Sequence, residues 1–185
     1  MMEQCQEQFS RLVSCELMTL RPERLLAHAK DSGPSGSQYR NRQSRVYPDY
    51  ETAQGRCVLS PPQKVNEEYL FDYIAFHSLK EVEGGWSWKF QPGVFEHSAE
   101  LHENLLAQGT RMANPPGPIV IVYGQQSALF DVDSAAYVRE CGGGHRPMIK
   151  LPNARHRLLL DQPVAFAWLL KAILVMSIRD NCVAG

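Results

Sequence analysis

The chain has 185 residues, a net charge of -1 and 44% hydrophobic residues, a composition typical of one globular domain. A near-neutral charge offers no basic surface, so we expect neither nucleic acid nor an anionic membrane as a partner. The five cysteines lie scattered at positions 5, 15, 57, 141 and 182, without a C-x-x-C pair. This spacing favours reduced thiols in the cytoplasm over a disulfide framework or a zinc site.

The apolar stretches of the sequence are too short for a membrane span. The longest, Val164–Ile178, falls below the roughly 20 residues that a span needs, and Lys171 lies in its middle. We therefore expect a buried helix near the end of the chain. The amino-terminal residues also lack the basic and apolar regions of a secretory signal.

The first half of the chain predicts helices, one strand and a loop. The apolar spacing of residues 12–20 predicts a helix that ends before Pro22, and residues 23–33 predict a buried strand. Polar residues and glycines over 34–45 indicate a surface loop or a linker. Three further helices are predicted, over residues 49–57, 66–80 and about 95–108.

The last third has a regular strand–helix–strand–helix order. The run from Pro118 to Tyr123 holds consecutive β-branched residues, which indicates a strand buried on both faces and hence a parallel sheet. A helix over about 131–140, a strand over 147–151 and a helix from about Pro163 follow. This order predicts an α/β fold.

His156 is the first candidate for chemistry, because it lies just beyond the predicted strand 147–151. Open parallel sheets place their ligands at the carboxyl ends of the strands. An imidazole titrates near neutral pH, so it can accept and return a proton. The alternative is an ordinary loop histidine between Arg155 and Arg157.

Several segments resemble the α/β-hydrolases. Residues 154–163, in which an acidic residue and a proline follow His156, are similar to the family's histidine loop. Residues 118–130 are similar to its penultimate core strand and the turn after it. Residues 79–90, with their Gly-Gly-Trp and Trp-Lys-Phe patterns, resemble the cap of bacterial-type members. The resemblance extends over about residues 12–175.

The resemblance implies an α/β fold that is an incomplete α/β-hydrolase fold. Residues 1–33 and 110–185 would form a partial parallel sheet with flanking helices, and residues 34–109 a helical cap insertion. In the intact family, the histidine at the position of His156 accepts the proton of a serine nucleophile and returns it to the leaving group. No cofactor is implied, and the substrate is a small ester-like molecule.

The nucleophile of the family is missing from this sequence. Its serine lies in a G-x-S-x-G turn, and no such motif occurs here; Gln8 falls where the serine belongs. Cys5 is an alternative nucleophile, but no glycines surround it. The first strands and the loop that supplies an oxyanion-hole donor have no counterpart either.

The resemblance to the α/β-hydrolases implies two candidate places for the acid that orients the histidine: the turn after the penultimate core strand, and the end of the earlier strand. The turn after the strand 118–123, residues 125–127, carries no carboxylate. We therefore favour Asp31, at the end of the predicted strand 23–33, while a turn or cap role for Asp31 stays open. Asp131 and Asp133 are expected at the N-terminus of the following helix, where acids are favoured.

Other features give weaker signals. Asp161 is expected to cap the last helix, and His97, Glu100 and His102 lack the H-E-x-x-H spacing of a metal site. Gly142–Gly144 precedes a strand, which argues against a phosphate site. Trp86 and Trp88 either line an acyl pocket that binds substrate or anchor the cap.

The sequence thus supports a protein of the α/β-hydrolase type whose ancestral chemistry is Ser-His-acid hydrolysis of ester-type bonds. The departures from the family pattern favour a truncated or inactive copy. The alternative is a non-catalytic binding or interaction module, which uses the cap and an exposed sheet edge and self-associates through that edge.

Overall fold

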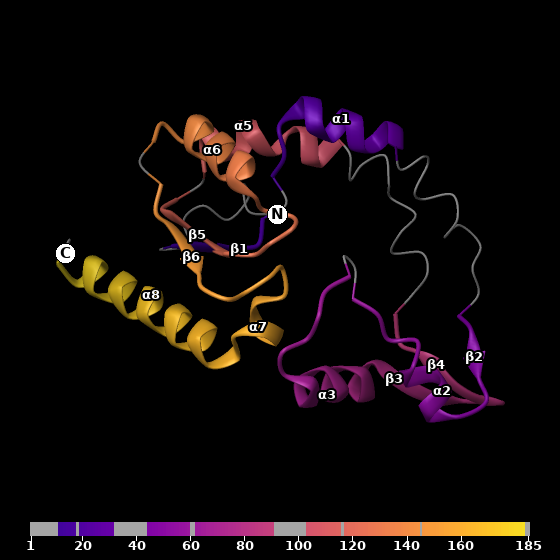
Figure 1. Cartoon of the computed structure of the whole chain (residues 1–185). Coiled ribbons are helices and arrows are strands. Elements are labelled where there is room, and N and C mark those ends of the chain that lie inside the picture. Colours follow the sequence, from indigo (N-terminus) through magenta and orange to yellow (C-terminus); the bar gives the residue numbers. More distant parts are fainter. Residues whose placement is uncertain are drawn as a thin grey trace. The chain divides into compact units, whose positions relative to one another are not determined.

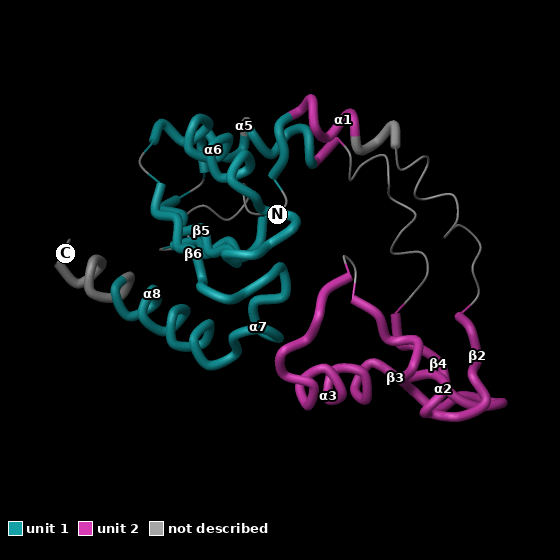
Figure 2. Tube along the Cα trace, in the orientation of Figure 1, with its two compact units in different colours: residues 1–21, 105–185 teal, residues 22–104 magenta. Residues whose placement is uncertain are grey.

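The computed structural model of the chain has two compact units, residues 1–21 with 105–185 and residues 22–104 (Figure 2). The structure describes residues 11–17, 19–31, 44–59, 62–90, 103–115, 117–144 and 146–183. Each unit contains a sheet of its own, and the first is parallel while the second is antiparallel.

A three-stranded parallel sheet organises the first unit (Figure 1). Its strands lie in the order β1 (Leu12–Cys15), β5 (Ile119–Gly124) and β6 (Met148–Leu151). The central strand β5 pairs with β1 along its first part and with β6 along its second. Because the three strands are parallel, their carboxyl ends lie at one edge, where open α/β sheets form their sites.

Helices cover both faces of this sheet. Successive side chains of a strand point to opposite faces. Ile121 therefore packs against α5 (Gln108–Ala113) and α6 (Val132–Cys141). Val122 packs against α7 (Leu158–Asp161) and α8 (Pro163–Val183). Both side chains are fully buried, which confirms the prediction of a parallel strand buried on both faces.

Arg21 connects the segment after β1 to helix α6. Its guanidinium donates to both carboxylate oxygens of Glu140, at 2.8 and 2.6 Å, and to Asp133 at 3.0 Å. The hydrogen bonds from Arg21 hold the pKa of Glu140 below its ordinary value. Exposed ion pairs contribute little stability on average, so the main effect of this bidentate contact is to fix the direction of the chain after β1.

The second unit is built on an antiparallel sheet of order β2-β4-β3. Its strands are β2 (Val46–Tyr47), β3 (Leu79–Val82) and β4 (Gly85–Trp88). Its helices are α1 (Pro22–Asp31), α2 (Tyr50–Gln54) and α3 (Glu68–Ser78). Gly85 has a φ of 136° and faces the carbonyl of Tyr47 so closely that a side chain at this position would collide with it.

Two predictions for the start of the chain are wrong. Residues 12–15 form the strand β1, where a helix over 12–20 is predicted, and Pro22–Asp31 form the helix α1, where a strand over 23–33 is predicted. Pro22 begins a helix instead of ending one, and Glu23 occupies its first turn, as is favourable at a helix N-terminus. The strand β1 forms because β5 offers a parallel partner, which local periodicity does not reveal.

The other predicted elements agree with the structure where it describes them. The helices α2, α3, α6 and α8 and the strands β5 and β6 lie at the predicted places. The first part of the helix predicted over 95–108 and most of the loop predicted over 34–45 lie outside the described residues. The hairpin formed by β3 and β4 is not among the predicted elements.

The helix α8 is only partly buried, which corrects the prediction of a buried helix. Ile173 lies in the core, and Phe166 and Leu169 pack against it. Trp168 and Met176 are instead exposed, at 63% and 62%. Within the part of the chain that the structure describes, no helix is long and apolar enough to cross a membrane.

We predict that Val138→Ala destabilises the first unit, whereas Val132→Ala does not. Both residues belong to α6, but Val138 is fully buried while Val132 is 87% exposed. The buried truncation should lower the free energy of unfolding by about 2 kcal/mol through lost contacts and a cavity. The exposed one should change it by less than about 0.5 kcal/mol. Urea unfolding followed by circular dichroism measures both, and equal effects would show that this core is not packed as described.

Candidate functional site

The loop that carries His156 is fixed at two backbone positions. The loop follows β6, and its Ala154 carbonyl accepts a hydrogen bond of 2.9 Å from the Gln126 N–H. The Arg155 N–H donates to the Asp161 carboxylate at 2.6 Å. Ala154 is fully buried. Because the backbone of the two residues before His156 is held in this way, the position of the His156 Cα, and hence the place from which the imidazole extends, is fixed.

The side chain of Asp161 is buried within the first unit and serves this loop. Its second carboxylate oxygen lies 3.4 Å from the Arg155 guanidinium, and the side chain has 0% exposure. A buried carboxylate requires such partners, since an unpaired charge away from water is costly. Asp161 is the last residue of α7. Asp161 therefore holds the loop in position through Arg155, and its expected capping of the last helix stays a prediction.

Glu16 directly follows β1 and lies at the same edge of the sheet as the loop that carries His156. Its backbone N–H donates to the Val122 carbonyl at 2.9 Å, which continues the pairing of β1 with β5 by one residue. Glu16 itself has a φ of 51°, the left-handed region that non-glycine residues rarely adopt. This turn ends the strand at the sheet edge where the carboxylate meets His156.

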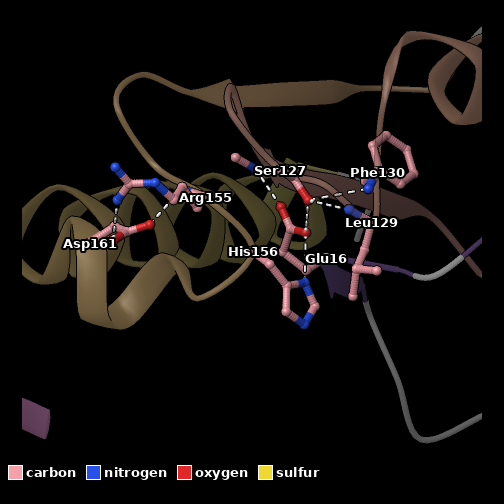
Figure 3. Close-up of polar contacts among 8 residues, drawn as sticks. Glu16, Ser127, Leu129, Phe130, Arg155, His156 and Asp161 are labelled. Atoms are coloured by element: carbon pink, nitrogen blue, oxygen red, sulfur yellow. Dashed lines mark hydrogen bonds and ion pairs between the residues drawn. The ribbon is translucent and has the colours of Figure 1, made fainter. Parts of the chain in front are cut away.

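The Glu16 carboxylate accepts three hydrogen bonds from three different segments (Figure 3). One oxygen accepts the backbone N–H of Gly124, at the end of β5. The other accepts the Ser127 hydroxyl at 2.5 Å and lies 2.9 Å from Nδ1 of His156. The side chain of Glu16 is only 6% exposed and that of His156 is 17% exposed. Glu16 therefore joins the carboxyl ends of β1 and β5 to the loop after β6.

Ser127 has a fixed role in this arrangement. Its hydroxyl oxygen accepts the N–H groups of Leu129 and Phe130, at 3.2 and 3.1 Å. With both donors on the oxygen, the hydroxyl proton is directed toward Glu16. The turn over 125–127, which the sequence shows to lack a carboxylate, thus supplies a donor to a carboxylate that comes from β1.

Gly124 is required by the close approach of the histidine loop. A side chain at this position would collide with the backbone carbonyls of Ala154 and Arg155. The same glycine donates its N–H to Glu16. One small residue at the end of β5 therefore serves both the packing of the loop and the hydrogen bonding of the acid.

The contact with Glu16 sets the chemistry that His156 can perform. An ionised carboxylate only accepts hydrogen bonds, so Nδ1 of the ring carries the proton. The neutral ring then has its free lone pair on Nε2, which can accept a proton from a reacting group. In the described residues, no hydroxyl or thiol is hydrogen-bonded to His156.

Glu16 is the functional residue that the sequence-based prediction misses. The sequence does contain an indication of Glu16, because a carboxylate directly follows the short apolar run of residues 12–15. With a helix predicted over 12–20, Glu16 is not expected at the end of a strand. Asp31, the residue favoured from the sequence, is the last residue of α1 in the second unit, and its side chain lies outside the described part.

The remaining candidates have the following places. Asp131 caps α6 by accepting the Ser134 N–H at 2.9 Å, and Asp133 lies in its first turn, which confirms the predicted helix N-terminus. Cys15 lies beside Glu16, and burial and the Glu16 charge both raise the pKa of its thiol, so it is a poor source of thiolate. Five residues named from the sequence, Cys5, Gln8, His97, Glu100 and His102, lie outside the described residues.

The two tryptophans lie on one strand in the second unit. Trp86 packs edge-on against the ring of Tyr50, with a centroid distance of 5.3 Å. Trp88 pairs with Leu79 across the hairpin and lines a groove together with Tyr47 and Phe90. No group of side chains in the described residues could hold a metal ion.

Several solved structures that resemble this chain are described as hydrolases or esterases. An esterase of Mycobacterium tuberculosis superposes with a TM-score of 0.65 at 16% identity, over 92% of this chain and 56% of its own. E-2-(acetamidomethylene)succinate hydrolase gives 0.63 at 16%, over 92% and 58%. The thioesterase domain from the curacin biosynthetic pathway gives 0.59 at 20%, over 88% and 57%. No protein-family model and no curated protein matches the sequence.

The chain spans less than three fifths of the length of these structures. At these identities the likeness establishes the fold. The predicted fold class is confirmed: the chain has an incomplete α/β-hydrolase fold, with a small parallel sheet and flanking helices.

Proposed function

We propose that this chain carries the histidine and the orienting acid of a site that hydrolyses ester-type bonds. His156 is the general base and Glu16 is the acid, in place of Asp31. The observation that carries the proposal is the 2.9 Å contact between the Glu16 carboxylate and Nδ1 of His156. This contact lies at the carboxyl ends of three parallel strands, where α/β folds place their sites.

The geometry suits proton transfer through the far side of the ring. Glu16 holds the proton on Nδ1 and so directs the lone pair of Nε2 away from itself. In hydrolysis by a Ser-His-acid mechanism, Nε2 accepts the hydroxyl proton of the nucleophile and returns it to the leaving group. The Glu16 carboxylate then stabilises the imidazolium that forms between these two steps.

The 185 residues by themselves are proposed to be inactive. The sequence contains no G-x-S-x-G motif, and no loop of it matches the one that supplies an oxyanion-hole donor. Loss of one oxyanion donor costs about a hundredfold to a thousandfold in rate, and loss of the nucleophile costs more. A segment that supplies both groups would complete the site around Glu16 and His156.

A second candidate function is that of an interaction module. The strand β1 lies at an edge of the described sheet. Edge strands present backbone groups to other chains, and Trp168 and Met176 add exposed apolar surface on α8. Self-association through these features would appear as concentration-dependent mass in light scattering, and a monomer at every concentration would exclude it.

We predict that Glu16→Gln changes the tautomer of His156. In the unmodified chain, ¹⁵N NMR of the imidazoles should show the neutral ring protonated at Nδ1, because Glu16 can only accept. A glutamine amide can donate as well as accept, so the variant should show a mixture of both tautomers. The exposed His77 serves as an internal reference that should not change. An unchanged His156 ring would mean that Glu16 does not orient it.

An assay with p-nitrophenyl esters tests the proposed chemistry. The isolated chain should show no turnover above that of buffer. A chimera should be active if the part of the Mycobacterium tuberculosis esterase that has no counterpart in this chain is fused before Leu12. In that chimera, His156→Ala and Glu16→Gln should each lower kcat by about a thousandfold or more.

The exposed neighbour Arg157 provides the control for this assay. Arg157→Ala alters the same loop and should leave the turnover of the chimera within about twofold, since surface changes have small effects. Circular dichroism verifies that each chimera is folded. A folded chimera whose turnover survives His156→Ala would refute the proposed role, and turnover by the isolated chain that His156→Ala abolishes would refute its inactivity.

A further inference from the structure

The second unit contains a groove of its own, whose lining residues do not include Glu16 or His156. It lies where the end of α3, the end of β4, the strand β2 and the segment after α2 converge, and it encloses about 690 Å³. Volumes of this size are typical of sites for small molecules. All of its lining residues belong to the unit 22–104, and none of them is near Glu16 or His156 in the sequence.

The walls of the groove are aromatic. Tyr47, Trp88 and Phe90 line it, and Phe90 is 54% exposed. Aromatic side chains that line a common hollow favour a flat apolar ligand over water. The strand register explains the arrangement, because β4 pairs with both β2 and β3 and so brings Tyr47 and Trp88 to the same small sheet.

The groove has basic lining residues. Arg56 and Lys89 line it together with His77, and none of the described lining residues is acidic. The ammonium of Lys89 donates to the carbonyl of His77 at 2.7 Å, at the end of α3, and it retains further donors for a ligand. The guanidinium of Arg45 lies 5.4 Å from the centre of the ring of Tyr47, one of the lining residues.

We propose that this groove binds a small organic anion with a flat aromatic body, such as an aryl carboxylate. The aromatic side chains would stack on the body of the ligand. Arg56 and Lys89 would bind its carboxylate through charge-assisted hydrogen bonds. The proposal does not depend on hydrolysis, because it uses neither His156 nor Glu16.

Calorimetric titration of the full chain with naphthoate and with the neutral naphthamide tests this proposal. The two compounds have similar shape and differ in charge. Naphthoate should bind about tenfold more tightly, since hydrogen bonds to a charged group are stronger than those to a neutral one. Arg56→Gln should remove most of this preference and leave the affinity for naphthamide within about twofold.

Lys80→Gln is the matched control. It removes the same charge from an exposed residue of the same unit that does not line the groove. It should leave the preference for naphthoate unchanged. NMR gives a second readout, because naphthoate should shift the indole N–H signal of Trp88 and leave that of Trp168, on α8, in place.

Several results would overturn the proposal. These are equal affinities for naphthoate and naphthamide, equal losses in Arg56→Gln and Lys80→Gln, or a shift of the Trp168 signal without one at Trp88. Absence of saturable binding by both compounds would overturn it as well. Each of these outcomes leaves the proposed roles of Glu16 and His156 untouched, so the two proposals fail separately.

Discussion

The carboxylate of Glu16 is the point at which three distant parts of the sequence meet. It accepts hydrogen bonds from the end of β5 and from the turn after it, and it contacts His156 in the loop after β6. A carboxylate that is nearly excluded from water requires such donors, because its charge would otherwise be costly to bury. The position of His156 therefore depends on the parallel pairing of β1 with β5 and of β5 with β6.

The surrounding residues make this meeting point rigid. Gly124 allows the backbone of the histidine loop to pass directly over the end of β5. Asp161 holds the loop from the other side through the Arg155 N–H. Ser127 lies in the turn after β5, which contains no carboxylate, and its hydroxyl donates to Glu16. The carboxylate that contacts His156 thus comes from the end of β1, and the turn after β5 contributes a hydrogen-bond donor to it.

The two units differ in their chemistry. The first unit supplies a carboxylate and an imidazole in contact, an arrangement that can transfer a proton. The second unit supplies aromatic side chains and cations around a groove, an arrangement that can hold an anion. Solved hydrolases share the fold over more than half of their length. Both proposals rest on named contacts within one unit, and neither needs the units to be placed relative to each other.

The fold class, the strands β5 and β6, most of the helices and the candidate His156 could all be predicted from the sequence. These features are local: β-branched runs, helical periodicity, and a histidine just after a strand. The secondary structure of residues 12–31 depends on tertiary contacts. The same contacts determine which carboxylate lies against His156. Residues 12–15 are a strand only because β5 lies beside them, and Glu16 contacts His156 only because that pairing carries it to the sheet edge. Such contacts join residues more than a hundred positions apart, and no local pattern encodes them.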